Sequence, residues 1–90
     1  MQRTIAEYKD IMLRKILMSK TQLEVLSVID RKIKMLRRKN ATNEWTQRFL
    51  DSSIVDLKNA DASSFNAQQW SNIRVAKGHL ENLKKFMHQV

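Results

Sequence analysis

The sequence predicts an all-α protein, a small bundle of three or four helices, and three observations lead to this prediction. The 90 residues include one glycine and no proline, whereas tight β-hairpins need such residues in their turns. Apolar residues recur at steps of three and four along most of the chain, which is the spacing of one helix face. A chain of this length buries a single core, so residues 1–90 are expected to form one helical domain.

The first helix is expected to begin just after Thr4. Thr4 and Glu7 have the spacing of a capping box, in which two side chains satisfy free backbone N–H groups at a helix start. Thr21 and Glu24 form a second such box after a pause in the apolar pattern, which predicts a break and a helical hairpin. One long N-terminal helix over residues 4–39 is the alternative, because the apolar positions on both sides of the pause share a heptad phase.

The second helix is expected to end near Lys39, where cap- and turn-forming residues replace apolar ones. A third helix is expected to start at Asn43 or Glu44. Its apolar residues are aromatic in the first half and aliphatic in the second. Small and polar residues over positions 59–64 then predict a loop.

The last helix has the clearest start signal. Asn66 and Gln69 have capping-box spacing, and Phe65 and Trp70 have the spacing of a hydrophobic staple. Apolar residues then continue at heptad spacing toward the C-terminus. Gly78 interrupts this pattern and is expected to mark a close approach between helices.

These patterns together predict the hydrophobic core. The chain has no cysteine, so its stability must come from helix packing or from association, and a homo-oligomer is left open. The residues expected in the core are Ile5, Tyr8, Met12, Leu26, Ile29, Ile33, Leu36, Phe49, Leu50, Ile54, Leu57, Ile73, Leu80 and Leu83.

The strongest functional signal is a run of cations. The formal net charge is +8, and residues 1–40 hold eleven Lys and Arg against four Asp and Glu (+7), whereas residues 41–90 hold six against five (+1). This run extends from Arg31 to Lys39. Within it, apolar residues occupy one helix face, and cations occupy most of the remaining circumference. This pattern indicates a polyanion or an acidic protein surface as partner. The predicted nucleic-acid-binding residues are Arg31, Lys32, Lys34, Arg37, Arg38 and Lys39, with Arg14, Lys15 and Lys20 as candidates to extend the patch.

A weaker signal for base recognition lies at the start of the last helix. Asn and Gln side chains pair with adenine, and Arg pairs with guanine. The turn before this helix lacks the glycine often found in a helix-turn-helix, and the staple already explains the region as a packing element. The candidate base or partner contacts are Gln68, Gln69, Asn72 and Arg74.

The larger aromatic residues are expected to pack in the core, because a small helical domain uses its few aromatic rings for packing. Any that prove to be exposed are candidates for a protein interface or for stacking on bases. The residues in question are Trp45, Phe49, Phe65 and Trp70.

No catalytic, metal or cofactor site is predicted. His79 and His88 lie nine residues apart, and no cysteine completes a zinc pattern. Asp51 and Asp56 are five residues apart on a short helix, a spacing that does not align two carboxylates on one face. The chain is therefore expected not to be an enzyme.

The sequence gives no sign of a membrane span. The N-terminal residues carry charges where a signal peptide needs an uninterrupted apolar region, and no apolar run approaches the roughly 18 residues of a spanning helix. A cytoplasmic protein is expected.

These observations predict a non-enzymatic accessory or regulatory protein that docks a cationic helix on the phosphates of nucleic acid. The alternative is a helical protein-binding module, such as an adaptor, chaperone or inhibitor, that engages an acidic protein partner, a nucleic-acid enzyme being one such target. An ordinary solvated helix face is the interpretation without a binding function. The choice between DNA and RNA, the sequence specificity and the oligomeric state are left open.

Overall fold

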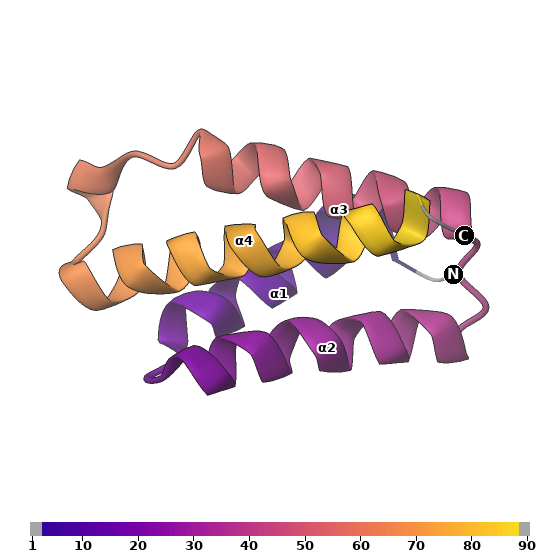
Figure 1. Ribbon diagram of the computed structural model, residues 1–90, viewed down its shortest axis with the longest axis horizontal. Coiled ribbons are helices and arrows are strands. Elements are labelled where there is room, and N and C mark those ends of the chain that lie inside the picture. The colour runs from indigo at the N-terminus through magenta and orange to yellow at the C-terminus, as the bar shows by residue number, and fades with distance from the viewer. Residues whose placement is uncertain (1–2, 89–90) are drawn as a thin grey trace.

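Four α-helices pack around a shared hydrophobic core in the computed structural model, which describes residues 3–88 (Figure 1). A short 3-10 helix, η1 (Ala62–Ser64), lies between the third and fourth helices, and the described residues contain no strand. The predicted all-α bundle and the predicted break near residue 20 are therefore confirmed. The helices are α1 (Ile5–Met18), α2 (Gln22–Arg38), α3 (Asn43–Lys58) and α4 (Ala67–His88).

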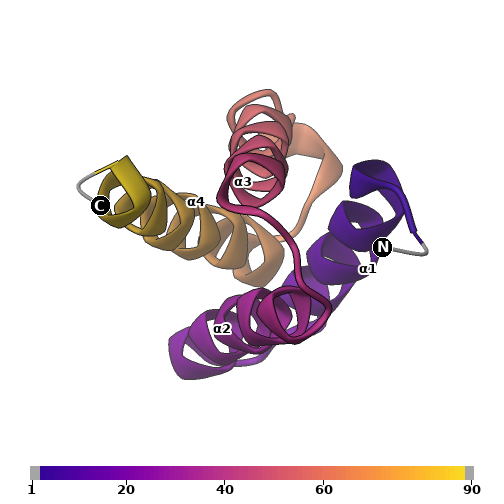
Figure 2. The ribbon, with the colours of Figure 1, turned by 90° about the vertical axis from the view of Figure 1, so that its right-hand side faces the viewer.

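Successive helices alternate in direction, and α4 packs against each of the other three (Figure 1). The start of α1 and the end of α4 lie at the same end of the bundle. Because α2 and α4 cross, their C-terminal ends lie apart at the end that faces the viewer in Figure 2. This arrangement leaves the side of α2 that faces away from α1 and α4 open to solvent.

Threonine caps start the first three helices. The hydroxyls of Thr4, Thr21 and Thr42 accept hydrogen bonds from the backbone N–H three residues later, at 3.2, 3.1 and 3.0 Å. The Glu24 carboxylate accepts a hydrogen bond from the Lys20 N–H at 2.8 Å, so it satisfies a donor just before the helix. These local bonds separate α1 from α2 without a glycine or a proline.

A Schellman motif ends α2. Asn40 has a positive φ of 64°, the left-handed conformation that asparagine adopts more readily than most residues. Its N–H donates to the Arg37 carbonyl, and the Ala41 N–H donates to the Leu36 carbonyl, both at 3.0 Å. The motif fixes the end of α2, where the helix dipole favours the cations of its last turn.

The predicted start of α4 is confirmed. The Asn66 side chain accepts a hydrogen bond from the Gln69 N–H at 2.7 Å, and the Gln69 side chain accepts one from the Asn66 N–H at 3.1 Å. Phe65 and Trp70, the predicted staple, are both half-buried against the core. The expectation for Gly78 is wrong, because an added Cβ there would meet no atom within 4 Å, so the glycine marks no close helix approach.

Most of the predicted core residues are buried, but the buried side of α2 differs from the prediction. Val25 is fully buried, whereas Leu26 is only half-buried. Val25 lies one helical turn before Ile29, on the same side of α2. This side faces the core because α2 packs against both α1 and α4. Ile5 and Leu83 are half-buried at the edge of the core. The core also takes in Ile16, Val25 and Ala76.

A buried amide on α4 holds the end of α1. Asn72 is 2% exposed, and its Nδ2 donates to the carbonyls of Ile16 and Ser19 at 2.9 and 2.7 Å. Its Oδ1 accepts a hydrogen bond from the Gln68 side chain at 3.0 Å. The Ile16 carbonyl also accepts a hydrogen bond from the Ser19 N–H at 3.1 Å. Asn72 adds a second donor to it and supplies one to the Ser19 carbonyl, just after the end of α1, where carbonyls lack the partners of a helix interior. It thereby ties the α1–α2 turn to α4.

Replacement of this amide is expected to destabilise the protein. Asn72→Ala should lower the free energy of unfolding by about 2 kcal/mol, because it removes two hydrogen bonds between α4 and the end of α1 and takes this donor from the Ser19 carbonyl. Asn82→Ala, an exposed control on the same helix, should change it by less than about 0.5 kcal/mol. Denaturant unfolding of both variants measures the difference, and equal stabilities would show that the Asn72 bonds are not needed.

Candidate functional site

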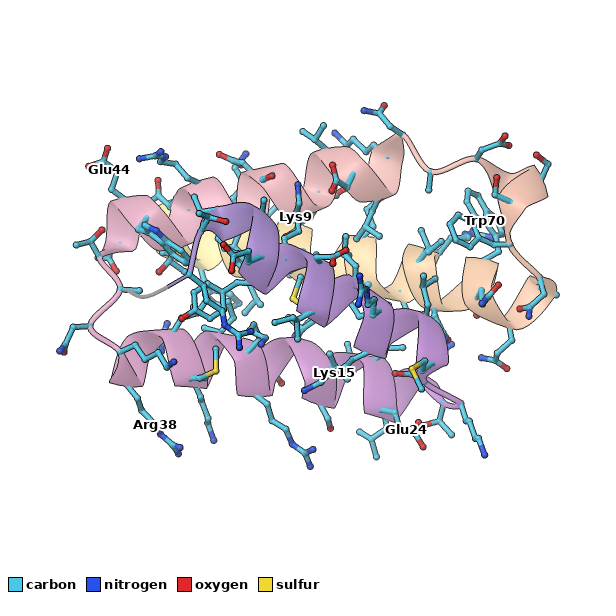
Figure 3. The ribbon with its side chains drawn as sticks, turned by 180° about the vertical axis from the view of Figure 1, so that it is seen from behind. Lys9, Lys15, Glu24, Arg38, Glu44 and Trp70 are labelled. Atoms are coloured by element: carbon cyan, nitrogen blue, oxygen red, sulfur yellow. The ribbon has the colours of Figure 1, made fainter. Side chains whose placement is uncertain are left out.

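The cations of α2 form the candidate site. Five of the six predicted residues are exposed, and we call this set the cationic face. Arg31, Lys34 and Arg38 are spaced by three and four residues, so they share one stripe along the helix. Figure 3 shows Arg38 pointing away from the bundle. The cationic face consists of Arg31, Lys34, Arg37, Arg38 and Lys39.

Carboxylates do not neutralise the cationic face. Among residues 3–88, the ion pairs within 4.0 Å involve no cation between positions 31 and 39. Asp30, the acid next to the face, lies 2.8 Å from Nε2 of His79 on α4. Glu24 is used at the α1–α2 turn. The charges of the cationic face are therefore available to an external anion.

The structure corrects the prediction for Lys32, which is buried rather than exposed. The residue is 8% exposed, and its Nζ lies 5.7 Å from the ring centroid of Tyr8 on α1. Nζ of Lys39 lies 5.8 Å from the same centroid. Burial lowers the pKa of Lys32, and the charges of Lys15, Arg3 and Lys39 lower it further. The helix periodicity alone could not show this, because Lys32 is buried by α1 and not by its own helix.

A small aromatic cluster supports the Tyr8 ring. Trp45 meets Tyr8 edge-on at 5.8 Å between centroids, and it stacks on Phe49 at 5.8 Å with an interplanar angle of 9°. The Tyr8 hydroxyl is buried without a hydrogen-bond partner among the described residues. Phe49 is buried and Trp45 is half-buried, so the expectation that these rings pack in the core is confirmed for Phe49 and holds in part for Trp45.

Cations of α1 and of the α1–α2 turn extend the candidate site only in part. Arg14 is paired with Asp10 at 2.9 Å, whereas Lys15 and Lys20 are exposed. A hollow of about 570 Å³ opens between α1 and α2, and Lys15 and Arg31 both line it. Figure 3 shows Lys15 reaching from α1 toward α2. The two helices thus bring their positive charges to one side of the molecule.

The prediction of base contacts at the start of α4 is not supported by the positions of these side chains. Asn72 is buried and bonded to α1, which contradicts its assignment as a contact residue. Gln69 closes the capping box and Gln68 donates to Asn72. Arg74 remains exposed, beside a shallow pocket that Trp70 also lines. The structure therefore does not bring the four residues together on one recognition surface.

One surface was missed by the sequence analysis. A groove of about 350 Å³ lies where α2 and α4 diverge, and it is largely apolar. Phe86, at its edge, is 67% exposed. The sequence signal for this groove is Phe86, a large apolar residue that lies outside the heptad series of α4 to which Leu83 and Met87 belong. The groove is lined by Ile33, Arg37, Asn43, Leu50, Leu83, Phe86 and Met87.

The described chain contains no cluster of three His, Cys, Asp or Glu side chains that could hold a metal ion. His79 contacts Asp30, and the side chain of His88 lies outside the described residues. Within residues 3–88, no helix combines the length and the apolar character needed to cross a bilayer.

Comparison with known proteins gives no further assignment. No family model, no curated protein and no solved structure matches this chain.

Lys32→Met is expected to change how stability depends on pH. The folded-state pKa of Lys32 lies below its ordinary value of 10.5, so the unfolded chain binds more protons than the folded protein between these two values. The free energy of unfolding of the wild type should therefore rise with pH in this window, relative to the variant.

Denaturant unfolding from neutral pH to about 10.5 measures this dependence. Lys34→Met, an exposed control on the same helix, should retain the wild-type pH profile. Parallel profiles for the wild type and Lys32→Met would contradict the desolvation of Lys32.

Proposed function

We propose that this protein is a non-enzymatic accessory or regulatory protein that binds nucleic acid through the cationic face of α2. The observation that carries the proposal is the set of five exposed cations with no carboxylate partner among residues 3–88. A charged surface of one sign raises the local concentration of a polyanion and its association rate. Nucleic acid is the polyanion that best matches a row of point charges on a rigid helix.

Phosphate contacts would dominate the interaction. Arg31, Lys34 and Arg38 span two turns of α2, about 10 Å, and a duplex carries about one charge per 1.7 Å of its axis. Each neutralised phosphate releases condensed counterions, which makes binding strong at low salt and weak at high salt. Side chains suited to base recognition are used elsewhere, since Asn72 is buried and Gln69 caps α4. The proposed mode is therefore docking on the backbone with little sequence preference.

The groove between α2 and α4 supports a second candidate function, binding of an acidic protein partner. It combines an apolar floor with the exposed ring of Phe86 and with Arg37 at its edge. Aromatic and arginine side chains are common anchors of protein interfaces. Such an interface has an apolar centre, so its affinity should persist at salt concentrations that abolish phosphate docking.

Charge reversal of the stripe is the direct test of the proposed function. Arg31, Lys34 and Arg38, each changed to Glu, should abolish binding to labelled duplex DNA, single-stranded DNA and RNA in fluorescence anisotropy. For the wild type, the logarithm of the binding constant should fall linearly with the logarithm of salt concentration, with a slope of about −0.9 for each phosphate contacted in B-DNA.

The matched control reverses Arg48, Lys58 and Lys85, which are exposed on α3 and α4 and produce the same change in net charge. This variant should retain most of the binding if the position of the charges matters, and circular dichroism should show unchanged helicity in both variants. Wild-type affinity in the first variant would remove the cationic face from the mechanism. Equal losses of affinity in the two variants would show that binding depends on the net charge of the protein and not on the cationic face.

A further inference from the structure

Lys32 is a buried cation whose charged surroundings are all cationic. Among residues 3–88, its ammonium has no ion-pair partner. Its pKa is lowered first by burial and then by the charges of Lys15, Arg3 and Lys39. Buried charges in proteins are ordinarily paired. Among the described residues, no carboxylate within 4.0 Å balances the charge of Lys32.

The Tyr8 ring compensates for only part of this charge. Nζ of Lys32 and Nζ of Lys39 lie 5.7 and 5.8 Å from the ring centroid. The negative face of an aromatic ring attracts a cation, but the ring has no net charge, and the two ammonium groups repel each other. Positive potential therefore remains where α1 and α2 meet.

The Lys32 ammonium is not completely sealed from solvent. Among the described residues, the Tyr8 hydroxyl is the only fully buried side-chain nitrogen or oxygen atom without a hydrogen-bond partner. The Lys32 ammonium is not fully buried in this sense, although only 8% of the residue surface is exposed. Its covered stem and open head group fix the position of the charge, as a binding site requires.

We infer that the α1–α2 seam, where Lys32 and Lys39 lie against the Tyr8 ring, binds a phosphate group. Two ammonium groups lie 5.7 and 5.8 Å from the centre of one ring, and a phosphate group offers several acceptor oxygens that can each face a different donor. It also carries up to two negative charges, more than a carboxylate. The inference goes beyond the proposed function, because it needs neither nucleic acid nor the Arg31, Lys34 and Arg38 stripe.

The seam lies beside the cationic face and shares Lys39 with it. Lys32 and Lys39 are seven residues apart on α2, so they project on the same side of the helix, about 100° around from Arg31. The phosphate has two sources with the same chemistry, the terminal phosphate of a nucleic acid or a free phosphate or small phosphomonoester. Both would reach the seam from the solvent side of α1 and α2.

The first experiment uses inorganic phosphate as the probe. The thermal midpoint of the wild type should rise with phosphate concentration, relative to sodium chloride at the same pH and ionic strength, because a ligand of the folded state stabilises it. Lys32→Met should weaken phosphate binding about tenfold or more, and Lys85→Met, an exposed control on α4, should not. Equal midpoints of the wild type in the two salts would overturn the inference.

A second measurement needs no variant, so it remains decisive if Lys32→Met does not fold. Phosphate is titrated into the isotope-labelled wild type, and backbone amide shifts are followed by NMR. Saturating shifts confined to the α1–α2 seam support the inference. Small shifts spread over all exposed cations, including Arg48 and Lys85, overturn it by showing non-specific ion binding.

The two sources are separated with a short oligonucleotide that carries either a 5′-phosphate or a 5′-hydroxyl. Tighter binding of the 5′-phosphate form, lost in Lys32→Met, assigns the seam to a nucleic-acid terminus. Equal binding of the two forms, with inorganic phosphate bound at the seam, assigns it to a free phosphate. Failure of the proposed function is recognised separately, as absence of oligonucleotide binding in a protein that still binds inorganic phosphate.

Discussion

The orientation of the cationic helix depends on one buried amide. Asn72 on α4 donates to the carbonyls of Ile16, in the last turn of α1, and of Ser19, just after it, and only residues 19–21 separate α1 from α2. Fixing the end of α1 therefore fixes the start of α2 and the direction in which its cations project. The same two bonds explain why a polar side chain is buried where α4 meets the end of α1, since a buried amide without partners would cost free energy.

The charges of α2 are divided by packing into two kinds. Arg31, Lys34 and Arg38 are solvated, and their mutual repulsion is weakened by water and salt. Lys32 is buried against the Tyr8 ring, with the exposed Lys39 beside the same ring, and repulsion is stronger where water is partly excluded. The solvated stripe suits a long polyanion held by many equivalent contacts, whereas the seam suits a single compact anion. One helix thus supports two proposals that differ in salt dependence and in ligand size.

Local chemistry explains why so much of the fold could be predicted. The helix starts at Thr4, Thr21 and Asn66 depend on side chains within three residues of the backbone groups that they satisfy, so sequence spacing reveals them. The burial of Ile29, Ile33 and Leu36 follows from periodicity in the same way. Lys32 and Asn72 could not be assigned from spacing, because each is buried by a helix distant in sequence. Their residue types indicated exposure or a base contact, and tertiary packing gave them other surroundings.

The sequence by itself determined the helical class, the approximate bounds of the helices and the concentration of positive charge on α2, because capping, periodicity and net charge are properties of neighbouring residues. It left open three or four helices, which the structure decided. Tertiary structure alone decided which cations are exposed, that the amide of Asn72 is used internally, and that an apolar groove opens beside Phe86. These features depend on how the helices cross. Crossing depends on contacts between residues up to 56 positions apart, as between Asn72 and Ile16, and no local pattern encodes them.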